Sequence, residues 1–278
     1  MNAQLKKINA LVSLLGDDDV NIRRVARSRL LAFGPPAVKL LNEVAYSDSE
    51  GRIRIEAKSL LEEIRISSLA AKFERLQNEE NFKLEMAALL LAQLAYPDLD
   101  ADAYVAKLDQ MADRAAAQLA GIDNGLRRVE LFNQFFFVQL GFQGNRDAYY
   151  DPENSYINRV IDRKVGIPIS LSLVYMLIAN RLGLPIFGIL FPGHFLLKYI
   201  SGKTLFFIDA FNGGLILTVQ DCELFSERMG FKLQHSHLRT ATPDRVFARM
   251  LRNLHKIYDQ LDDQRMLTHL KEVFYDYI

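Results

Sequence analysis

The chain has 278 residues and 50% of them are hydrophobic, so it is long enough to bury a substantial core. Lysine plus arginine and aspartate plus glutamate number 34 each, and this balance gives no electrostatic reason to expect a nucleic-acid or membrane-surface partner. The single cysteine, Cys222, excludes an internal disulfide and a thiolate metal cluster. Together with an N-terminal apolar run that ends in three aspartates and does not resemble a signal peptide, this predicts a cytoplasmic protein.

The most hydrophobic stretch, residues 165–197, is not a predicted membrane span. A span needs roughly 18 or more consecutive apolar residues, and Asn180, Arg181 and His194 interrupt this one. The glycines and prolines within it are typical of turns. We therefore expect a buried helix and buried strands here, and no contact with a membrane.

The first 66 residues carry a weak internal repeat. Aligning position 20 with position 51 matches Ile22 with Ile53 and Ala26 with Ala57, inside apolar patterns that are typical of helices. A period of about 31 residues built from paired helices resembles a HEAT-type unit. Because two such units bury little surface between them, we expect residues 1–66 to dock on the rest of the chain.

Helices are also predicted on both sides of the central segment. Residues 81–96 form a helix that Pro97 stops, and residues 101–120 and 127–142 form two more. Phe132, Phe135, Phe136 and Val138 are predicted core residues of the last of these. Apolar spacing in residues 244–278 indicates a helical hairpin, which resembles half of a tetratricopeptide-like unit. The predicted domains are residues 1–66, 67–243 and 244–278.

The central segment reads as a helix followed by a hairpin. Asn154 or Ser155 is expected to cap a short helix that starts near Tyr156. A longer helix is predicted from Ile167 and Pro168 to Leu182, because proline is well suited to a first helical turn. Strands are predicted over residues 186–191, 194–200 and 204–210.

The expected register of the hairpin places a histidine beside a carboxylate. If Ser201 and Gly202 form a two-residue loop, His194 lies directly opposite Asp209. A carboxylate in that position fixes the tautomer of an imidazole and stabilises its charged form, as in a catalytic triad. Alternatively, the histidine merely starts a strand and binds any local acceptor.

Several pieces of the chain together resemble the SirB-type branch of the transglutaminase-like superfamily. They are LEMAALLLAQLAYPDLD, the run from LGFQGNRDAYYDPENSYINRV to NRLGLP, FPGHFLLKY and IDAFNGG, and they span residues 70–260 approximately. The resemblance implies a papain-like α+β core, in which a helix packs on a small antiparallel sheet. The predicted fold is thus mostly helical α+β, with HEAT-like helices before the core and a helical hairpin after it.

The resemblance also assigns the triad positions. His194 matches the base and Asp209 the orienting carboxylate of the superfamily, whose helix opens with Gly-x-Cys. In this chain the opening reads Gly166-Ile167-Pro168, so the nucleophile position falls on Pro168, which has no nucleophilic atom. Ser170 lies two residues further, about 200° around the helix, and Ser172 returns to the same face one turn deeper.

Three functions remain open from the sequence. The favoured one is a catalytically inactive transglutaminase-like pseudoenzyme that binds or regulates another protein or peptide. The second is a serine-based acyl transferase or amidohydrolase that uses Ser170 or Ser172 with His194 and Asp209. The third is a small-ligand binder with a cleft between helix 167–182 and the hairpin. No nucleotide-binding glycine loop and no convincing metal ligands are present, so we expect neither a cofactor nor a metal.

Overall fold

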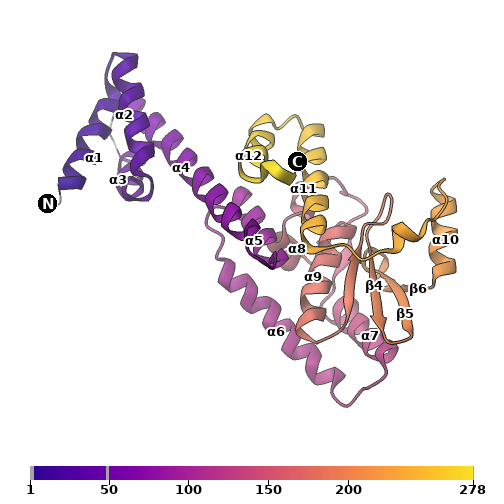
Figure 1. Cartoon of the computed structure of the whole chain (residues 1–278). Helices are drawn as coiled ribbons and strands as arrows, with labels where there is room; N and C mark the ends of the chain where they lie inside the picture. The colour runs from indigo at the N-terminus through magenta and orange to yellow at the C-terminus, as the bar shows by residue number, and fades with distance from the viewer. Residues whose placement is uncertain (1–2, 48–49, 278) are drawn as a thin grey trace. The chain divides into compact units, whose positions relative to one another are not determined.

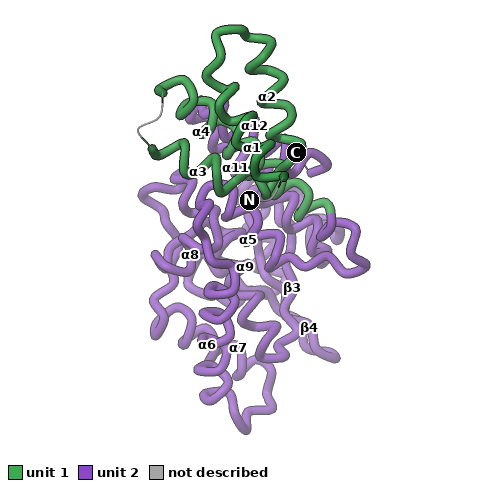
Figure 2. The backbone as a smooth tube through the Cα atoms, turned by 90° about the vertical axis from the view of Figure 1, so that its left-hand side faces the viewer, with its two compact units in different colours: residues 1–74 green, residues 75–278 purple. Residues whose placement is uncertain are grey.

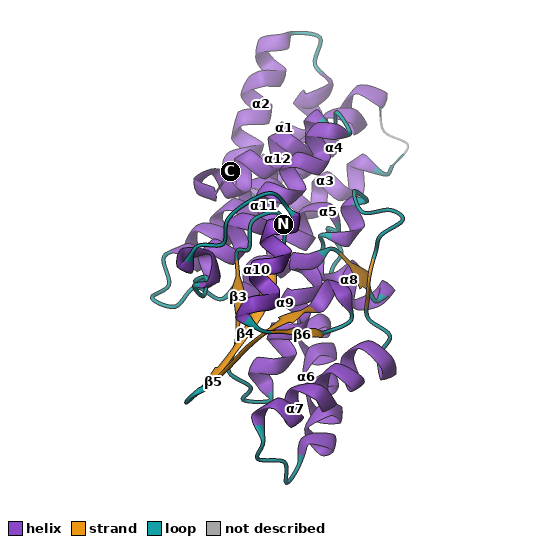
Figure 3. Cartoon of the chain, turned by 90° about the vertical axis from the view of Figure 1, so that its right-hand side faces the viewer, coloured by secondary structure: helices purple, strands orange, loops and turns teal. Residues whose placement is uncertain are grey.

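The computed structural model describes residues 3–47 and 50–277. The chain divides into two compact units, residues 1–74 and 75–278 (Figure 2). Helices dominate both, and the strands all belong to the second unit (Figure 3). The predicted class, α+β and mostly helical, is confirmed. Within the described residues, no helix is both long and apolar enough to cross a membrane.

The first unit is helical, as the repeat predicts. Its helices are α1 (Ala3–Ser13), α2 (Val20–Phe33), α3 (Pro35–Ala45) and α4 (Gly51–Gln77), with a 3-10 turn at Leu14–Gly16. The first residues of α2 and α4 are the two positions that the repeat aligns. The predicted domain boundary at residue 66 falls within α4, which continues into the second unit. The predicted division into three domains stays a prediction.

The first unit has an apolar core of its own, although the repeat alone predicted little internal burial. Ala26 and Ala57, which the repeat aligns, are both fully buried. The residues that share this core come from all four helices and are Ile8, Leu11, Val12, Leu15, Ala26, Leu30, Ala37, Leu41, Ala45, Ala57, Leu60 and Ile64. Burial of this much apolar surface stabilises the packing of these four helices against one another.

The second unit begins with helices close to those expected. They are α5 (Leu84–Ala95), which ends before Pro97, α6 (Ala101–Leu119) and α7 (Gly125–Asn133). A π-helical turn, Gln134–Gln139, follows α7. Phe132, Phe135 and Phe136 are buried as predicted, but Val138 is 75% exposed and does not belong to the core. A π-turn adds a residue to the turn and so changes which side chains face inward.

The sheet is a four-stranded antiparallel meander in the order β3-β4-β5-β6. Its strands are β3 (Ile186–Ile189), β4 (Leu196–Ser201), β5 (Thr204–Asp209) and β6 (Leu215–Leu217). Helix α9 (Pro168–Arg181) contacts β3 and β4, so a buried helix packs on the sheet (Figure 1). A short parallel pair, β1 (Gln143–Gly144) and β2 (Val165–Gly166), flanks α8 (Ile157–Arg163).

The C-terminal helices belong to the same compact unit as the sheet. After α10 (Val219–Arg228), the chain forms the predicted hairpin of α11 (Pro243–Gln260) and α12 (Gln264–Phe274). Helix α11 contacts α5 and α9. The buried hydroxyls of Tyr156 and Tyr258 lie 2.7 Å apart and join the start of α8 to α11. These contacts hold α11 beside the start of α9, where it forms one wall of the site.

Candidate functional site

The start of α9 is built around Pro168. Pro168 is the first helical residue, where its missing N–H removes no helical hydrogen bond and its ring fixes a helical φ. Ile167 precedes it in an extended conformation, and the Ser170 hydroxyl accepts from the Ile167 amide at 3.1 Å. The same hydroxyl donates to the carbonyl oxygen of Asn154. Ser170 is 1% exposed, so its side chain joins the helix start to the preceding loop.

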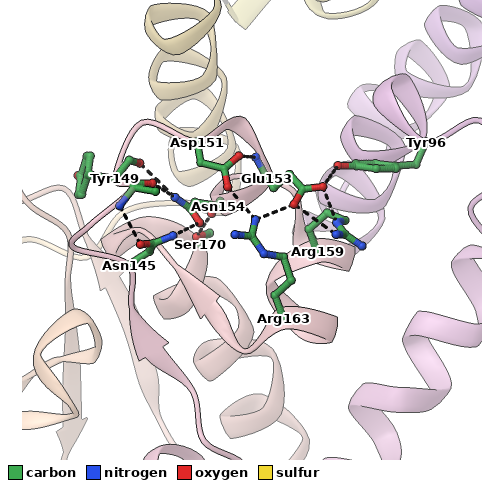
Figure 4. A network of polar contacts seen from close by, with 10 residues as sticks. Tyr96, Asn145, Tyr149, Asp151, Glu153, Asn154, Arg159, Arg163 and Ser170 are labelled. Atoms are coloured by element: carbon green, nitrogen blue, oxygen red, sulfur yellow. Dashed lines mark hydrogen bonds and ion pairs between the residues drawn. The ribbon is translucent and has the colours of Figure 1, made fainter.

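The predicted caps of α8 are wrong. Tyr156 is its N-cap residue and makes no side-chain cap hydrogen bond. The fully buried Asn154 instead donates to the carbonyl oxygens of Ala148 at 2.6 Å and Tyr149 at 3.3 Å, and accepts from Asn145 at 3.1 Å (Figure 4). An amide that is satisfied by loop carbonyls is not free to cap a helix. Asn154 therefore holds residues 145–154 against α9.

A tight turn over residues 191–194 positions His194. The His194 amide donates to the Phe191 carbonyl at 3.1 Å, with Pro192 and Gly193 between them. Gly193 has φ of 69°, and proline followed by a glycine with positive φ is typical of a type II turn. A side chain at position 193 would be strained in this conformation. The turn ends at the imidazole, which is 9% exposed.

The predicted register of the hairpin is wrong by two residues. The loop is Gly202 and Lys203, with Ser201 opposite Thr204 and Leu197 opposite Ile208. Gly202 takes φ of 58°, which a left-handed turn position requires. Because side chains alternate with a period of two, a shift of two residues keeps the same face. His194 thus lies just before β4 and still reaches Asp209.

His194 and Asp209 form a buried pair. Nε2 of His194 lies 3.0 Å from Oδ2 of Asp209. At this distance the imidazole and the carboxylate interact directly. Asp209 also accepts from the amides of Phe211 at 3.1 Å and Asn212 at 3.2 Å, and from the Asn212 side chain at 2.7 Å.

These contacts keep Asp209 ionised. Burial raises the pKa of Asp209, but His194 and the Asn212 donors outweigh that effect and hold the pKa below its ordinary value. A carboxylate in this position fixes the tautomer and the ring orientation of an imidazole and stabilises its charged form. The pair can therefore act on a group beside His194, or it can serve only to satisfy a buried histidine.

A cavity of about 240 Å³ lies beside the pair. Pro168 and His194 both line it. The lining residues include no serine, threonine or cysteine; they are Tyr149, Tyr150, Ile167, Pro168, Ile169, Gly193, His194, Phe195, Arg249, Asn253, Lys256 and Ile257.

The other nucleophile candidates lie outside this cavity. Ser170 forms hydrogen bonds at the helix start, and the fully buried Ser172 hydroxyl has no hydrogen-bond partner among the described residues. Cys222 is buried in an apolar cluster with Phe191 and Leu196. Burial, followed by nearby carboxylates, raises the pKa of the Cys222 thiol to about 12, so it stays protonated at neutral pH.

The α11 wall of the cavity was not predicted from the sequence. Arg249, Asn253 and Lys256 lie four and three residues apart, so they share one face of α11. That spacing is visible in the sequence, but it resembles the solvent-facing stripe of any amphipathic helix. Across residues 3–47 and 50–277, no group of three or more histidine, cysteine, aspartate or glutamate residues is placed to hold a metal ion.

Comparisons with known proteins agree with this architecture. A family model described as "Transglutaminase-like superfamily" matches residues 102–252. A UPF0162 protein of Xylella fastidiosa is 35% identical over 199 residues, which cover 66% of this chain and 68% of the relative. A UPF0162 protein of Vibrio cholerae is 30% identical over 172 residues, covering 61% of this chain and 64% of the relative.

A eukaryotic relative shares a shorter segment. F-box only protein 21 of Homo sapiens is 44% identical over 103 residues, which cover 34% of this chain and 16% of that protein. No solved structure matches the chain. The family match spans more than half of the chain and contains α9, His194 and Asp209. The chain therefore belongs to the transglutaminase-like superfamily and, within it, to the SirB-like group of UPF0162 proteins.

Proposed function

We propose that this protein is a catalytically inactive transglutaminase-like domain that binds another protein or peptide. The observation that carries the proposal is the composition of the cavity: Pro168 stands at the start of α9, on the cavity that His194 also lines. A histidine and a carboxylate can move a proton, but acyl transfer through an enzyme thiol needs a nucleophile that proline lacks. A cytoplasmic location stays part of the proposal.

The serine-based alternative has weaker support. Ser170 donates to the Asn154 carbonyl and accepts from the Ile167 amide, which explains its burial without catalysis. Ser172 lies one turn deeper and is 0% exposed. A nucleophile must come within hydrogen-bond reach of its base, directly or through one water. Neither hydroxyl lines the cavity beside His194.

The alternative function, binding of a small-molecule ligand, also has weak support. Pockets for such ligands usually occupy about 300–1,000 Å³, and the cavity beside His194 has about 240 Å³. This volume is better suited to one side chain or one chain end of a larger partner. A thermal-shift screen of the whole chain against metabolites should therefore give no consistent stabilisation.

Intact-mass analysis after incubation with a fluorophosphonate probe tests the inactive assignment. The probe labels activated serines, and His194→Ala provides the control because it removes the base. We expect no adduct on either folded protein. An adduct on Ser170 or Ser172 that disappears in His194→Ala would replace this proposal with the serine-based enzyme.

A binding measurement completes the test. An affinity for a protein partner, found by co-purification and then measured with purified components, should survive His194→Ala as long as the fold does. A substrate that the native protein turns over, and that His194→Ala does not, would contradict the proposal.

A further inference from the structure

The cavity beside His194 has cationic side chains and no acidic one in its lining. Arg249 and Lys256 come from α11, and no aspartate or glutamate is among the lining residues. Asp209 lies behind the imidazole and is 3% exposed. A concave surface that holds cations without carboxylates concentrates a positive potential and favours an anionic group.

Arg249 differs from Arg163 and Arg181, two other half-buried arginines of this unit. Arg163 forms ion pairs with Asp151 at 2.9 Å and Glu153 at 2.8 Å, and Arg181 pairs with Glu85 at 2.8 Å and Asp109 at 2.6 Å. Arg249 is also half-buried, but within the described part of the chain it forms no ion pair and no hydrogen bond. Because desolvation of an unpaired charge is unfavourable, its position on the cavity needs a physical reason.

The surroundings of Arg249 disfavour its charged form, and the cavity lining provides no carboxylate to offset this. Burial lowers the pKa of Arg249, the neighbouring Arg252 lowers it further, and Tyr149 opposes them. Burial and Tyr150 raise the pKa of Tyr149, so its hydroxyl remains a hydrogen-bond donor at neutral pH. Tyr149 and Asn253 therefore add neutral donors beside the two cations.

The volume of the cavity and the guanidinium of Arg249 favour a carboxylate as the bound anion. A guanidinium fork matches the two oxygens of a carboxylate, and about 240 Å³ admits a chain end or one acidic side chain. We propose that this cavity binds a carboxylate group of a partner peptide, held by Arg249 and Lys256 with donors from Tyr149 and Asn253. The inference rests on the proposed binding function and names the group that is recognised.

Three pools of fluorescent random octapeptides test the proposal with the whole chain. The first has free C-terminal carboxylates and no acidic side chains, the second has amidated ends with aspartate and glutamate, and the third has amidated ends with asparagine and glutamine. Fluorescence anisotropy at about 150 mM salt limits contributions from unpaired surface charges. We expect the first or the second pool to bind at least about tenfold more tightly than the third.

Arg249→Met is the diagnostic variant, and Arg252→Met is its matched control, because Arg252 is exposed on the same helix and does not line the cavity. Arg249→Met should remove the preference for carboxylates, whereas Arg252→Met should change affinity less than about twofold. A preference for the first pool identifies a chain end, and a preference for the second identifies an acidic side chain.

Other results would overturn the inference. Equal binding of all three pools, unchanged by Arg249→Met, would leave the protein-binding function standing and reject carboxylate recognition. A preference that persists in Arg249→Met would place the carboxylate elsewhere. Absence of binding by every pool would also reject it, whereas the proposed function fails separately, through a fluorophosphonate adduct or a measured turnover. Circular dichroism of each variant verifies that the fold is intact.

Discussion

Two neighbouring groups of charges in the second unit are arranged in opposite ways. In the loop network, Asp151 and Glu153 bind Arg159 and Arg163, and Tyr96 donates to Glu153 at 3.2 Å (Figure 4). In the cavity beside His194, the cations of α11 face no carboxylate. Both groups flank the start of α9. Their position in the fold therefore does not explain why one group is paired with carboxylates and the other is not.

The difference separates charges that hold the structure from charges that we propose are available to a partner. In the loop network, each carboxylate accepts hydrogen bonds from arginine side chains. These bonds fix residues 151–163, which lead into the site. Arg249 is exposed to the cavity and receives no such compensation from the described residues. Sites of recognition commonly retain a polar group that only the ligand satisfies, because binding is then selective for ligands that provide the missing partner.

The largest effect is expected from Asn154→Ala. This change removes the amide that binds two loop carbonyls and Asn145, in a position with 0% exposure. The change removes these hydrogen bonds and leaves the partner groups buried without one. It should therefore lower the free energy of unfolding by about 3 kcal/mol. Urea denaturation measures the free energy of unfolding. For comparison, we expect Asn145→Ala to lower it by about 1 kcal/mol. Equal effects would mean that Asn154 does not anchor the loop.

A smaller effect is expected from Glu153→Gln. Glu153 binds Arg159 at 2.9 Å and Arg163 at 2.8 Å, and its side chain is 36% exposed, so solvent screens part of the interaction. We expect a loss of about 1 kcal/mol in the free energy of unfolding. Arg249→Met should change the same quantity by less than about 0.5 kcal/mol, because no partner is lost. A larger loss in Arg249→Met than in Glu153→Gln would contradict the distinction between the two groups.

The smallest effect is a pH dependence that comes from Asp209. Its pKa is lower in the folded state than in the unfolded state, so its stabilising contribution is present above the unfolded pKa, about 4, and is lost as the pH falls through the folded pKa. The unfolding free energy of the native protein should therefore decline more steeply below about pH 4 than that of Asp209→Asn. The exposed Asp113→Asn serves as the control. Parallel curves for the native protein and Asp209→Asn would show that the pair does not lower this pKa.

Local patterns in the sequence predicted most of the helices and strands. Apolar spacing and proline stops placed α5, α9 and α11 within a few residues, because these signals act within one or two turns. The hairpin register was wrong because the glycine that takes positive φ is the first loop residue, Gly202. Val138 was placed in the core because the π-helical turn leaves no clear sign in the sequence.

The candidate site was only partly visible from the sequence. The resemblance assigned roles to His194, Asp209 and Pro168, and the turn at Gly193 brings the imidazole to the cavity. Arg249 and Lys256 come from α11, which follows all three residues in the chain, and only tertiary packing places them beside the cavity. Asn154 appeared to be a helix cap because caps and loop anchors use the same residue types.

The proposed inactivity of this protein depends most on the position of Pro168 beside His194, and Pro168→Cys tests that position directly. The native chain has one cysteine, the buried Cys222, whose high pKa should make alkylation slow. If residue 168 faces His194, iodoacetamide should alkylate Pro168→Cys at least about tenfold faster at neutral pH than Pro168→Cys/His194→Ala, because the imidazole promotes thiolate formation. Equal rates in these two folded variants would contradict the assignment of Pro168 to the nucleophile position.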